Sequence, residues 1–132
     1  MRLLKSKLFM GVSLALLTTG LAAMPAAARE IERSGKCSGD SYYSADMELE
    51  YRVWDLSFDI DTRATNQKWR FELKQNGRSV YTNTRSTIRD FDDSYAEVEW
   101  DLIRPDRSGR DRFQFVAKNQ ATGEVCRVTL RQ

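Results

Sequence analysis

Apolar and polar residues alternate one by one along most of this chain, and this period of two is typical of β-strands with one buried face. In the segment 68–74 every second residue is Trp, Phe or Leu, and the residues between them are charged. Asn76-Gly77 follows, and both residues accept the positive φ angles of a two-residue type I′ turn. The sequence therefore predicts a β-hairpin here, with a return strand over residues 79–84.

Another alternating segment runs from Met47 to Val53 and includes Tyr51 on its apolar side. Beyond it the apolar residues change from odd to even positions, which predicts a bulge or tight turn near Trp54-Asp55. We expect the apolar side of this segment to be buried.

The whole pattern predicts an all-β fold. Residues 29–45 lack clear alternation and are interpreted as an irregular N-terminal lead-in, and the polar segment 85–94 as a loop crossing between sheets. About seven short strands without helical periodicity predict a sandwich of two antiparallel sheets, of the immunoglobulin or fibronectin III type. A β-barrel is the alternative. We expect a core that contains Trp69, Phe71, Val98, Trp100, Phe113 and Val128.

The N-terminus has the three parts of a cleavable signal peptide. Three basic residues lie within the first seven, an uncharged apolar run follows, and Ala26 and Ala28 form the small-residue pattern that signal peptidase accepts. An uncleaved membrane anchor is the alternative, because the uncharged run is close to the length of a spanning helix. The sequence predicts a signal peptide over 1–28 and one secreted, extracellular domain over 29–132.

Cys37 and Cys126 are the only cysteines in the sequence. An even number of cysteines in a small exported domain predicts disulfide bonding, here one bond between the lead-in and the last strand. Closing a loop of about ninety residues would stabilise the fold by about 4.5 kcal/mol in the chain-entropy model. Metal-binding thiols are disfavoured because the chain has no His and no C-x-x-C.

Charge gives no support for a nucleic-acid partner. Without Arg2, Lys5 and Lys7 of the predicted signal, the formal net charge of +2 becomes −1 for residues 29–132. Acidic and basic residues are interspersed along that part, which predicts a solvated surface of mixed charge.

Motifs for catalysis are missing from the sequence. It contains no His, no G-x-S-x-G and no S-x-x-K, so the common general bases and activated nucleophiles are absent. Carboxylate pairs such as Asp59 and Asp61 fall on the charged side of a strand and are interpreted as solvated. We expect a non-enzymatic domain without a cofactor.

One loop is a weak candidate for a metal site. Asp90, Asp92 and Asp93 supply the oxygen ligands that Ca²⁺ takes, but the Gly and distal Glu of an EF-hand are missing. We interpret these residues as turn formers.

Two further groups are weak candidates for binding. Arg107 and Arg110 lie in a cluster with two more arginines, but interspersed aspartates favour a salt-bridged hairpin end in which their field is cancelled. The aspartates among the arginines are Asp101, Asp106 and Asp111.

Tyr42, Tyr43 and Trp54 fit the alternating core least well and suggest either a contact surface or packing at the sandwich end.

Three stretches carry a resemblance: Cys37-Ser38-Gly39, the strand and Asn-Gly hairpin over 66–78, and the segment 122–127. Together they resemble a group of small secreted bacterial proteins of uncharacterised function. The resemblance implies a common architecture over most of the domain and no particular activity.

These features favour a secreted binding domain that uses loops or an exposed sheet edge to contact an extracellular protein or a cell-wall component. The alternative is an inhibitor of an extracellular hydrolase that presents the loop 104–111.

Overall fold

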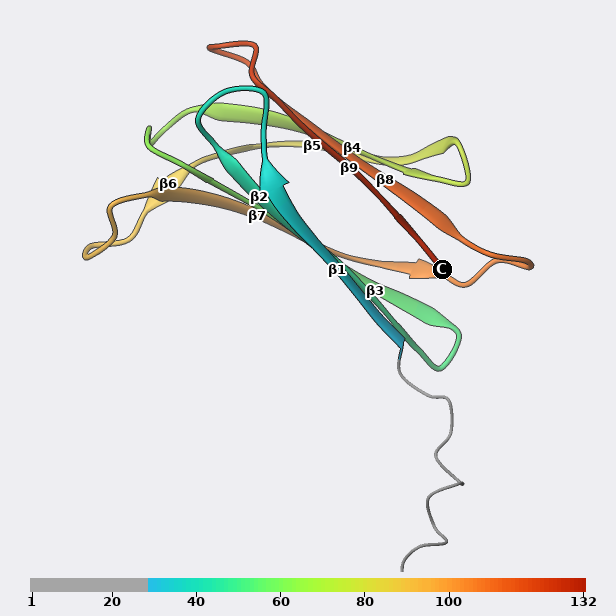
Figure 1. The fold of residues 1–132 in the computed structure, drawn as a ribbon. Helices are drawn as coiled ribbons and strands as arrows, with labels where there is room; N and C mark the ends of the chain where they lie inside the picture. Colours follow the sequence, from blue (N-terminus) through green and yellow to red (C-terminus); the bar gives the residue numbers. More distant parts are fainter. Residues whose placement is uncertain (1–28) are drawn as a thin grey trace, which may run out of the picture.

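The structure, a computed structural model, describes residues 29–132, so the predicted signal peptide lies outside the described residues. The described part is built entirely from strands and their connections (Figure 1). They are β1 (Arg29–Lys36), β2 (Tyr42–Glu50), β3 (Val53–Thr62), β4 (Lys68–Gln75), β5 (Arg78–Ser86), β6 (Ile88–Arg89), β7 (Ala96–Pro105), β8 (Arg112–Asn119) and β9 (Val125–Arg131).

The strands form two antiparallel sheets packed face to face (Figure 1). The five-stranded sheet has the order β1-β2-β3-β7-β6, and the four-stranded sheet has the order β5-β4-β8-β9. The predicted all-β sandwich of two antiparallel sheets is therefore confirmed. The segment 85–94 carries the chain from one sheet to the other, as expected, and contains the short strand β6.

The prediction of an irregular lead-in over 29–45 is wrong. Residues 29–36 form β1, which pairs with β2 from Arg29↔Leu49 to Lys36↔Tyr42. This edge strand offers little apolar surface to the core, since Ile31 is only partly buried. Alternation fails as a signal in such a strand because both of its faces are largely polar.

An aromatic cluster fills the space between the sheets. Phe58 of the five-stranded sheet stacks on Phe71 and Phe115 of the other sheet, with ring centroids 5.5 and 5.4 Å apart. Trp100 lies 4.7 Å from Phe71 across the same interface. Dense packing of this kind supplies most of the hydrophobic stabilisation of a small domain. All the predicted core residues are buried: Trp69, Phe71, Val98, Trp100, Phe113 and Val128.

The change of phase comes from a tight turn, but this turn lies at Tyr51-Arg52 and not near Trp54-Asp55, where it was expected, because both of those residues belong to β3. Glu50 pairs with Val53, so Tyr51 and Arg52 form a two-residue hairpin loop between β2 and β3. Tyr51 is 91% exposed at the tip of this loop. Its assignment to a buried apolar face is therefore wrong, because the strand ends one residue before it.

The predicted disulfide between Cys37 and Cys126 is confirmed, with Cα atoms 4.4 Å apart. Cys37 directly follows β1, and Cys126 lies in β9 of the opposite sheet. The bond therefore joins the two sheets at one side of the sandwich. A disulfide in this position indicates an oxidising compartment.

Within residues 29–132 there is no helix of sufficient length and apolarity to cross a membrane.

Candidate functional site

A polar cluster links the two sheets where the β4–β5 turn, the β7–β8 loop and the C-terminus meet. Asp111 lies at its centre and is 1% exposed. The indole Nε1 of Trp54 donates to Asp111 Oδ2 at 2.9 Å, and Asn76 Nδ2 donates to Oδ1 at 2.8 Å. Gln75 Nε2 and the amide nitrogen of Arg107 also donate to the carboxylate, at 3.2 and 3.0 Å. A buried carboxylate thus holds both sheets and the β7–β8 loop in place.

These donors keep Asp111 ionised. Burial alone would raise the pKa of Asp111, but hydrogen bonds from Asn76, Trp54 and the Arg107 amide outweigh burial and lower it. Its neighbour Asp106 shares a hydrogen bond with Asp111, and this bond, with a smaller contribution from burial, raises the pKa of Asp106. The Oδ1 atom of Asp106 is buried and has no hydrogen-bond partner among the described residues.

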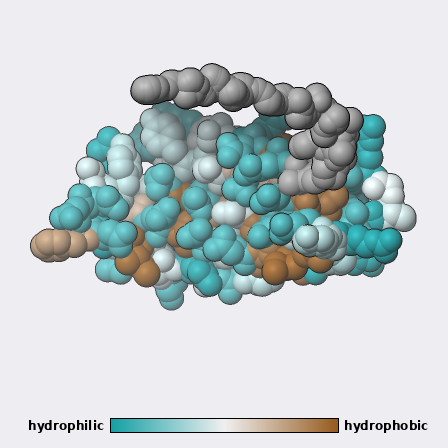
Figure 2. All heavy atoms as spheres, turned by 90° about the horizontal axis from the view of Figure 1, so that it is seen from below, coloured by the Kyte–Doolittle hydropathy of each residue, from teal (hydrophilic) through white to brown (hydrophobic). Residues whose placement is uncertain are grey.

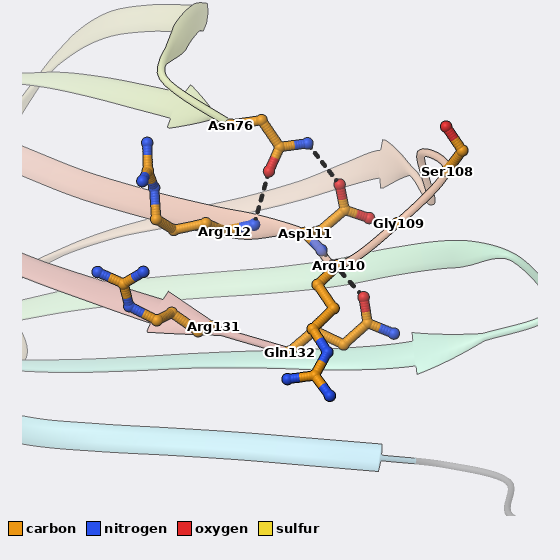
Figure 3. A pocket seen from close by; sticks show the side chains of 8 residues that line it. All are labelled: Asn76, Ser108, Gly109, Arg110, Asp111, Arg112, Arg131 and Gln132. Atoms are coloured by element: carbon orange, nitrogen blue, oxygen red, sulfur yellow. Dashed lines mark hydrogen bonds between the residues drawn. The ribbon is translucent and has the colours of Figure 1, made fainter.

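An open hollow of about 650 Å³ lies against this cluster. Figure 3 shows Arg112 and Arg131 extending side by side from neighbouring strands, with Arg110 on the adjoining loop. Asn76 accepts a hydrogen bond from the Arg112 amide at 2.8 Å, and Gln132 accepts one from the Asp111 amide at 3.0 Å. The backbone that carries the arginines is therefore fixed, while their exposed guanidinium groups border the hollow.

A second hollow adjoins the first and shares Asn76 with it. Arg78 and Arg107 are among its lining residues. The structure thus gathers arginines from three separate segments around one end of the four-stranded sheet: Arg78, Arg107, Arg110, Arg112 and Arg131.

Arg112 and Arg131 are direct cross-strand partners. Like charges directly opposite each other in a sheet destabilise it, so this pair raises the energy of the free protein. A phosphate or carboxylate bound between the two guanidinium groups would remove the repulsion and satisfy their donors.

These arginines continue into the outward surface of the four-stranded sheet, which we call the basic face. Glu72 is the single acidic residue among the outward side chains of β4, β8 and β9. The basic residues there are Lys68, Arg70, Lys74, Arg112, Lys118, Arg127 and Arg131.

The outward surface of the five-stranded sheet, which we call the acidic face, has the opposite charge. Lys36 at the end of β1 is the one basic residue on the outward side of its described strands. Figure 2 shows one side of the molecule, on which hydrophilic residues cover most of the described surface. The acidic residues of the face are Glu30, Glu32, Asp46, Glu48, Glu50, Asp55, Asp59, Asp61, Glu97, Glu99 and Asp101.

The expectation of a surface of mixed charge is therefore wrong for both sheet faces. Charges that alternate along the chain are sorted in space, because the strands with acidic outward residues join one sheet and those with basic outward residues join the other.

The fold separates the three aspartates that were expected to cancel the arginine field. Asp101 lies on the acidic face opposite Ser57, and Asp111 turns into the cluster between the sheets, where it accepts a hydrogen bond from Trp54. Asp111 is ionised and lines the same hollow as the arginines, so it offsets part of their charge, whereas Asp101 lies on the other sheet. Arg107 and Arg110 lie in the gathered group, whereas sequence reasoning missed Arg78 and Arg131. Strand parity in the predicted hairpins was the signal that could have placed Arg112 beside Arg131.

Asp59 lies in the middle of the acidic face. Burial, followed by the charges of Glu99 and Glu97, raises the pKa of Asp59 from 3.8 to about 7. Its buried Oδ1 atom has no hydrogen-bond partner among the described residues. The face therefore holds more negative charge than its own groups compensate.

The aromatic candidates are separated by the fold. Trp54 is fully buried and bonded to Asp111, so the suggestion of a contact surface is wrong for this residue. Tyr43 is half-buried and stacks on Phe58 at 6.2 Å, whereas Tyr42 is 48% exposed at the start of β2.

Asp90, Asp92 and Asp93 lie in the connection between β6 and β7. Across residues 29–132, no three or more His, Cys, Asp or Glu residues are grouped in a way that could hold a metal ion.

Comparison with protein-family models, curated proteins and solved structures finds no match to this chain. The resemblance to small secreted bacterial proteins therefore stays a prediction.

Proposed function

We propose that this domain is an exported, non-enzymatic binding module that holds a polyanion on its basic face and in the adjoining arginine-lined hollow. The observation that carries the proposal is the adjacent pair Arg112 and Arg131, joined by Arg110 at the rim of the hollow. Guanidinium groups so placed supply paired donors that match the oxygens of phosphate and carboxylate groups.

The extent of the basic face favours a polymer over a small anion. Single exposed charges contribute little at physiological ionic strength, since water and salt screen them. The basic residues of β4, β8 and β9 recur at strand spacing, about 4.8 Å across the sheet and about 6.6 Å along it. A chain with repeated phosphate or carboxylate groups can contact many of them at once, and such contacts add.

The face lacks the features that recognise nucleic-acid bases. The outward side chains of β4, β8 and β9 include no aromatic residue, so these described strands offer no platform on which bases would stack. An anionic polymer of the cell envelope, recognised by its charge spacing, fits this surface better.

The strand order supports placing the domain in the immunoglobulin-like class. If β2 to β9 take the letters A, B, C, C′, D, E, F and G, the sheets read A-B-E-D and C′-C-F-G, with β1 as an additional edge strand. In this class loops at the sandwich ends and exposed surfaces bind partners, while the core is a passive scaffold. The signal-like N-terminus and the disulfide support an extracellular location for such a binding role.

The test is binding of inorganic polyphosphate and of polygalacturonate, which present repeated phosphate and carboxylate groups respectively. We expect the triple variant Arg110→Gln, Arg112→Gln, Arg131→Gln to weaken binding of the preferred polymer at least tenfold. Affinity of the unmodified protein should also fall steeply with salt, as for other charge-driven polyanion complexes. The ratio of the two affinities identifies which anionic group the site prefers.

The matched control is Arg33→Gln, Arg63→Gln, Arg89→Gln, which removes the same charge from exposed positions outside the basic face. We expect it to change the affinity less than twofold. An equal loss in both triple variants would show that net charge alone drives binding and would overturn the proposed site. Binding of neither polymer at low salt would overturn the function.

A further inference from the structure

Two outward faces of opposite charge lie on opposite sides of one sandwich. We propose that a second copy of this chain docks its basic face on the acidic face of the first, so that domains stack head to tail. This self-association goes beyond polyanion binding and makes use of the acidic face, which has no part in the proposed function.

Both faces are internally repulsive in a single copy. On the basic face, Arg112 opposes Arg131 and Arg70 opposes Lys118. Cross-strand like charges cost free energy that an oppositely charged surface would recover. The corresponding acidic pairs are Glu30 with Glu48, Glu32 with Asp46, Glu48 with Asp55, Asp59 with Glu99, and Asp61 with Glu97.

The centre of the acidic face is crowded with carboxylates that are not compensated by a basic group of the described chain. The buried Oδ1 atom of Asp59 has no partner within residues 29–132, and Ser44 and Glu99 are its cross-strand neighbours. The negative charges that act on it are those of Glu99, Glu97, Asp101 and Asp61. A lysine or arginine from a second copy would bring the opposite charge close to this group of carboxylates.

The two faces are similar in size. The acidic residues lie on the adjacent strands β1, β2, β3 and β7, and the basic residues lie on β4, β8 and β9, which are three of the four strands of the other sheet. Four strands about 4.8 Å apart and about eight residues long cover about 500 Å². Contact between two such faces would bury about 1,000 Å² in total, the lower limit for a specific interface. The association should therefore be weak, reversible and sensitive to salt.

The geometry also sets the form of the assembly. The interface joins two different surfaces, so it is heterologous, and the surfaces point away from each other across the sandwich. Such a contact repeats without closing and produces an open stack whose length depends on concentration.

Two variants test the two sides of the interface separately. The acid-face variant carries Asp59→Asn, Asp61→Asn, Glu97→Gln and Glu99→Gln, and the basic-face variant carries Arg70→Gln, Arg112→Gln, Lys118→Gln and Arg127→Gln. Each retains one intact face and should sediment as a monomer by itself. Mixed in equal amounts, they should form a dimer and no larger species, because each copy has only one competent face.

Sedimentation velocity of the unmodified chain should show species larger than a dimer at about 10 mM salt, where the Debye length is about 30 Å, and a monomer at about 1 M salt. Circular dichroism of each variant must match that of the unmodified chain. Should a quadruple variant not fold, the pairs Glu97→Gln/Glu99→Gln and Arg112→Gln/Lys118→Gln take its place.

A monomeric unmodified chain at low salt would overturn the stack, as would a mixture of folded variants that stays monomeric. Association of either variant alone to the extent of the unmodified chain would also overturn it. The acid-face variant separates this proposal from the proposed function, because it should lose stacking and keep full binding of the preferred polyanion.

Discussion

The two sheet faces differ in charge although their strands follow the same rule of alternation. The charged outward residues of β2, β3 and β7 are acidic, and those of β4, β8 and β9 are basic except for Glu72. The core sides of both sheets are equally apolar and meet in one aromatic cluster. Burial therefore explains why the inward residues are apolar. It does not determine whether the outward residues are acidic or basic.

Chain order conceals this separation. The path runs from the acidic sheet to the basic sheet at β4, returns at β6, and leaves again at β8. Acidic and basic strands consequently follow one another in the sequence and cancel in the net charge. For a sandwich, charge is better counted by sheet face than by sequence window.

The largest effect should come from the aspartate that faces inward. Asp111→Ala should reduce the free energy of unfolding by about 3 kcal/mol, because Trp54, Asn76 and Gln75 would lose a buried charged acceptor. Chemical denaturation measures this change. The matched control is Asp101→Ala on the acidic face, which should leave stability unchanged or slightly raised. Equal losses in both variants would contradict the division between an inward structural carboxylate and outward surface carboxylates.

The sequence predicts the fold better than it predicts the site. Alternation identified Trp69, Phe71 and Trp100 as core residues because burial in a strand has a direct signature of period two. Edge strand β1 was not predicted, because it has little apolar surface. Trp54 was not assigned to the core, because the turn just before its strand changes the phase of the alternation.

The site depends on contacts between residues distant in the sequence. Arg112 and Arg131 become partners only through the β8–β9 register, and Arg78 reaches the same end through a different hairpin. No local pattern encodes which strand lies next to which. The inward turn of Asp111 is likewise set by Trp54 and Asn76 and not by its own neighbours in the chain.

An intermediate effect should come from Asp59 at the centre of the acidic face. The pKa of Asp59 is 3.8 in the ordinary case and about 7 in the fold, first because of burial and then because of Glu99 and Glu97. Between these values the folded chain holds a proton that the unfolded chain has lost, so stability falls as pH rises from 3.8 to 7.

Asp59→Asn removes this penalty. After allowance for screening by water, we expect the variant to gain about 1 kcal/mol above pH 7 and nothing below pH 3.8. Thermal unfolding at a series of pH values measures the difference. Asp55→Asn, an exposed change on the same strand, should show a smaller gain above pH 7. A gain at Asp59 that stayed constant over the whole range would rule out the titration as its cause.

The smallest effect should come from the two hairpin turns, one in each sheet. Both loops have two residues at positive φ: Tyr51 and Arg52 at 53° and 67° in the acidic sheet, Asn76 and Gly77 at 54° and 85° in the basic sheet. Asn-Gly is the preferred pair for such a turn, whereas Tyr and Arg incur steric strain there. Tyr51→Asn with Arg52→Gly should therefore raise the free energy of unfolding by about 0.5 to 1 kcal/mol, measured by denaturation.

The reverse change tests the same cause in the other sheet. Gly77→Ala should cost about 1 kcal/mol, because alanine at a φ of 85° is strained and Arg112 lies 3.4 Å from the added Cβ atom. If the Asn-Gly pair at 51 and 52 gives no gain while Gly77→Ala does cost stability, the exposed Tyr51 ring must contribute packing at the hairpin tip that offsets its backbone strain. The two turns then differ in how they are stabilised, and the acidic sheet relies on a side chain where the basic sheet relies on the backbone.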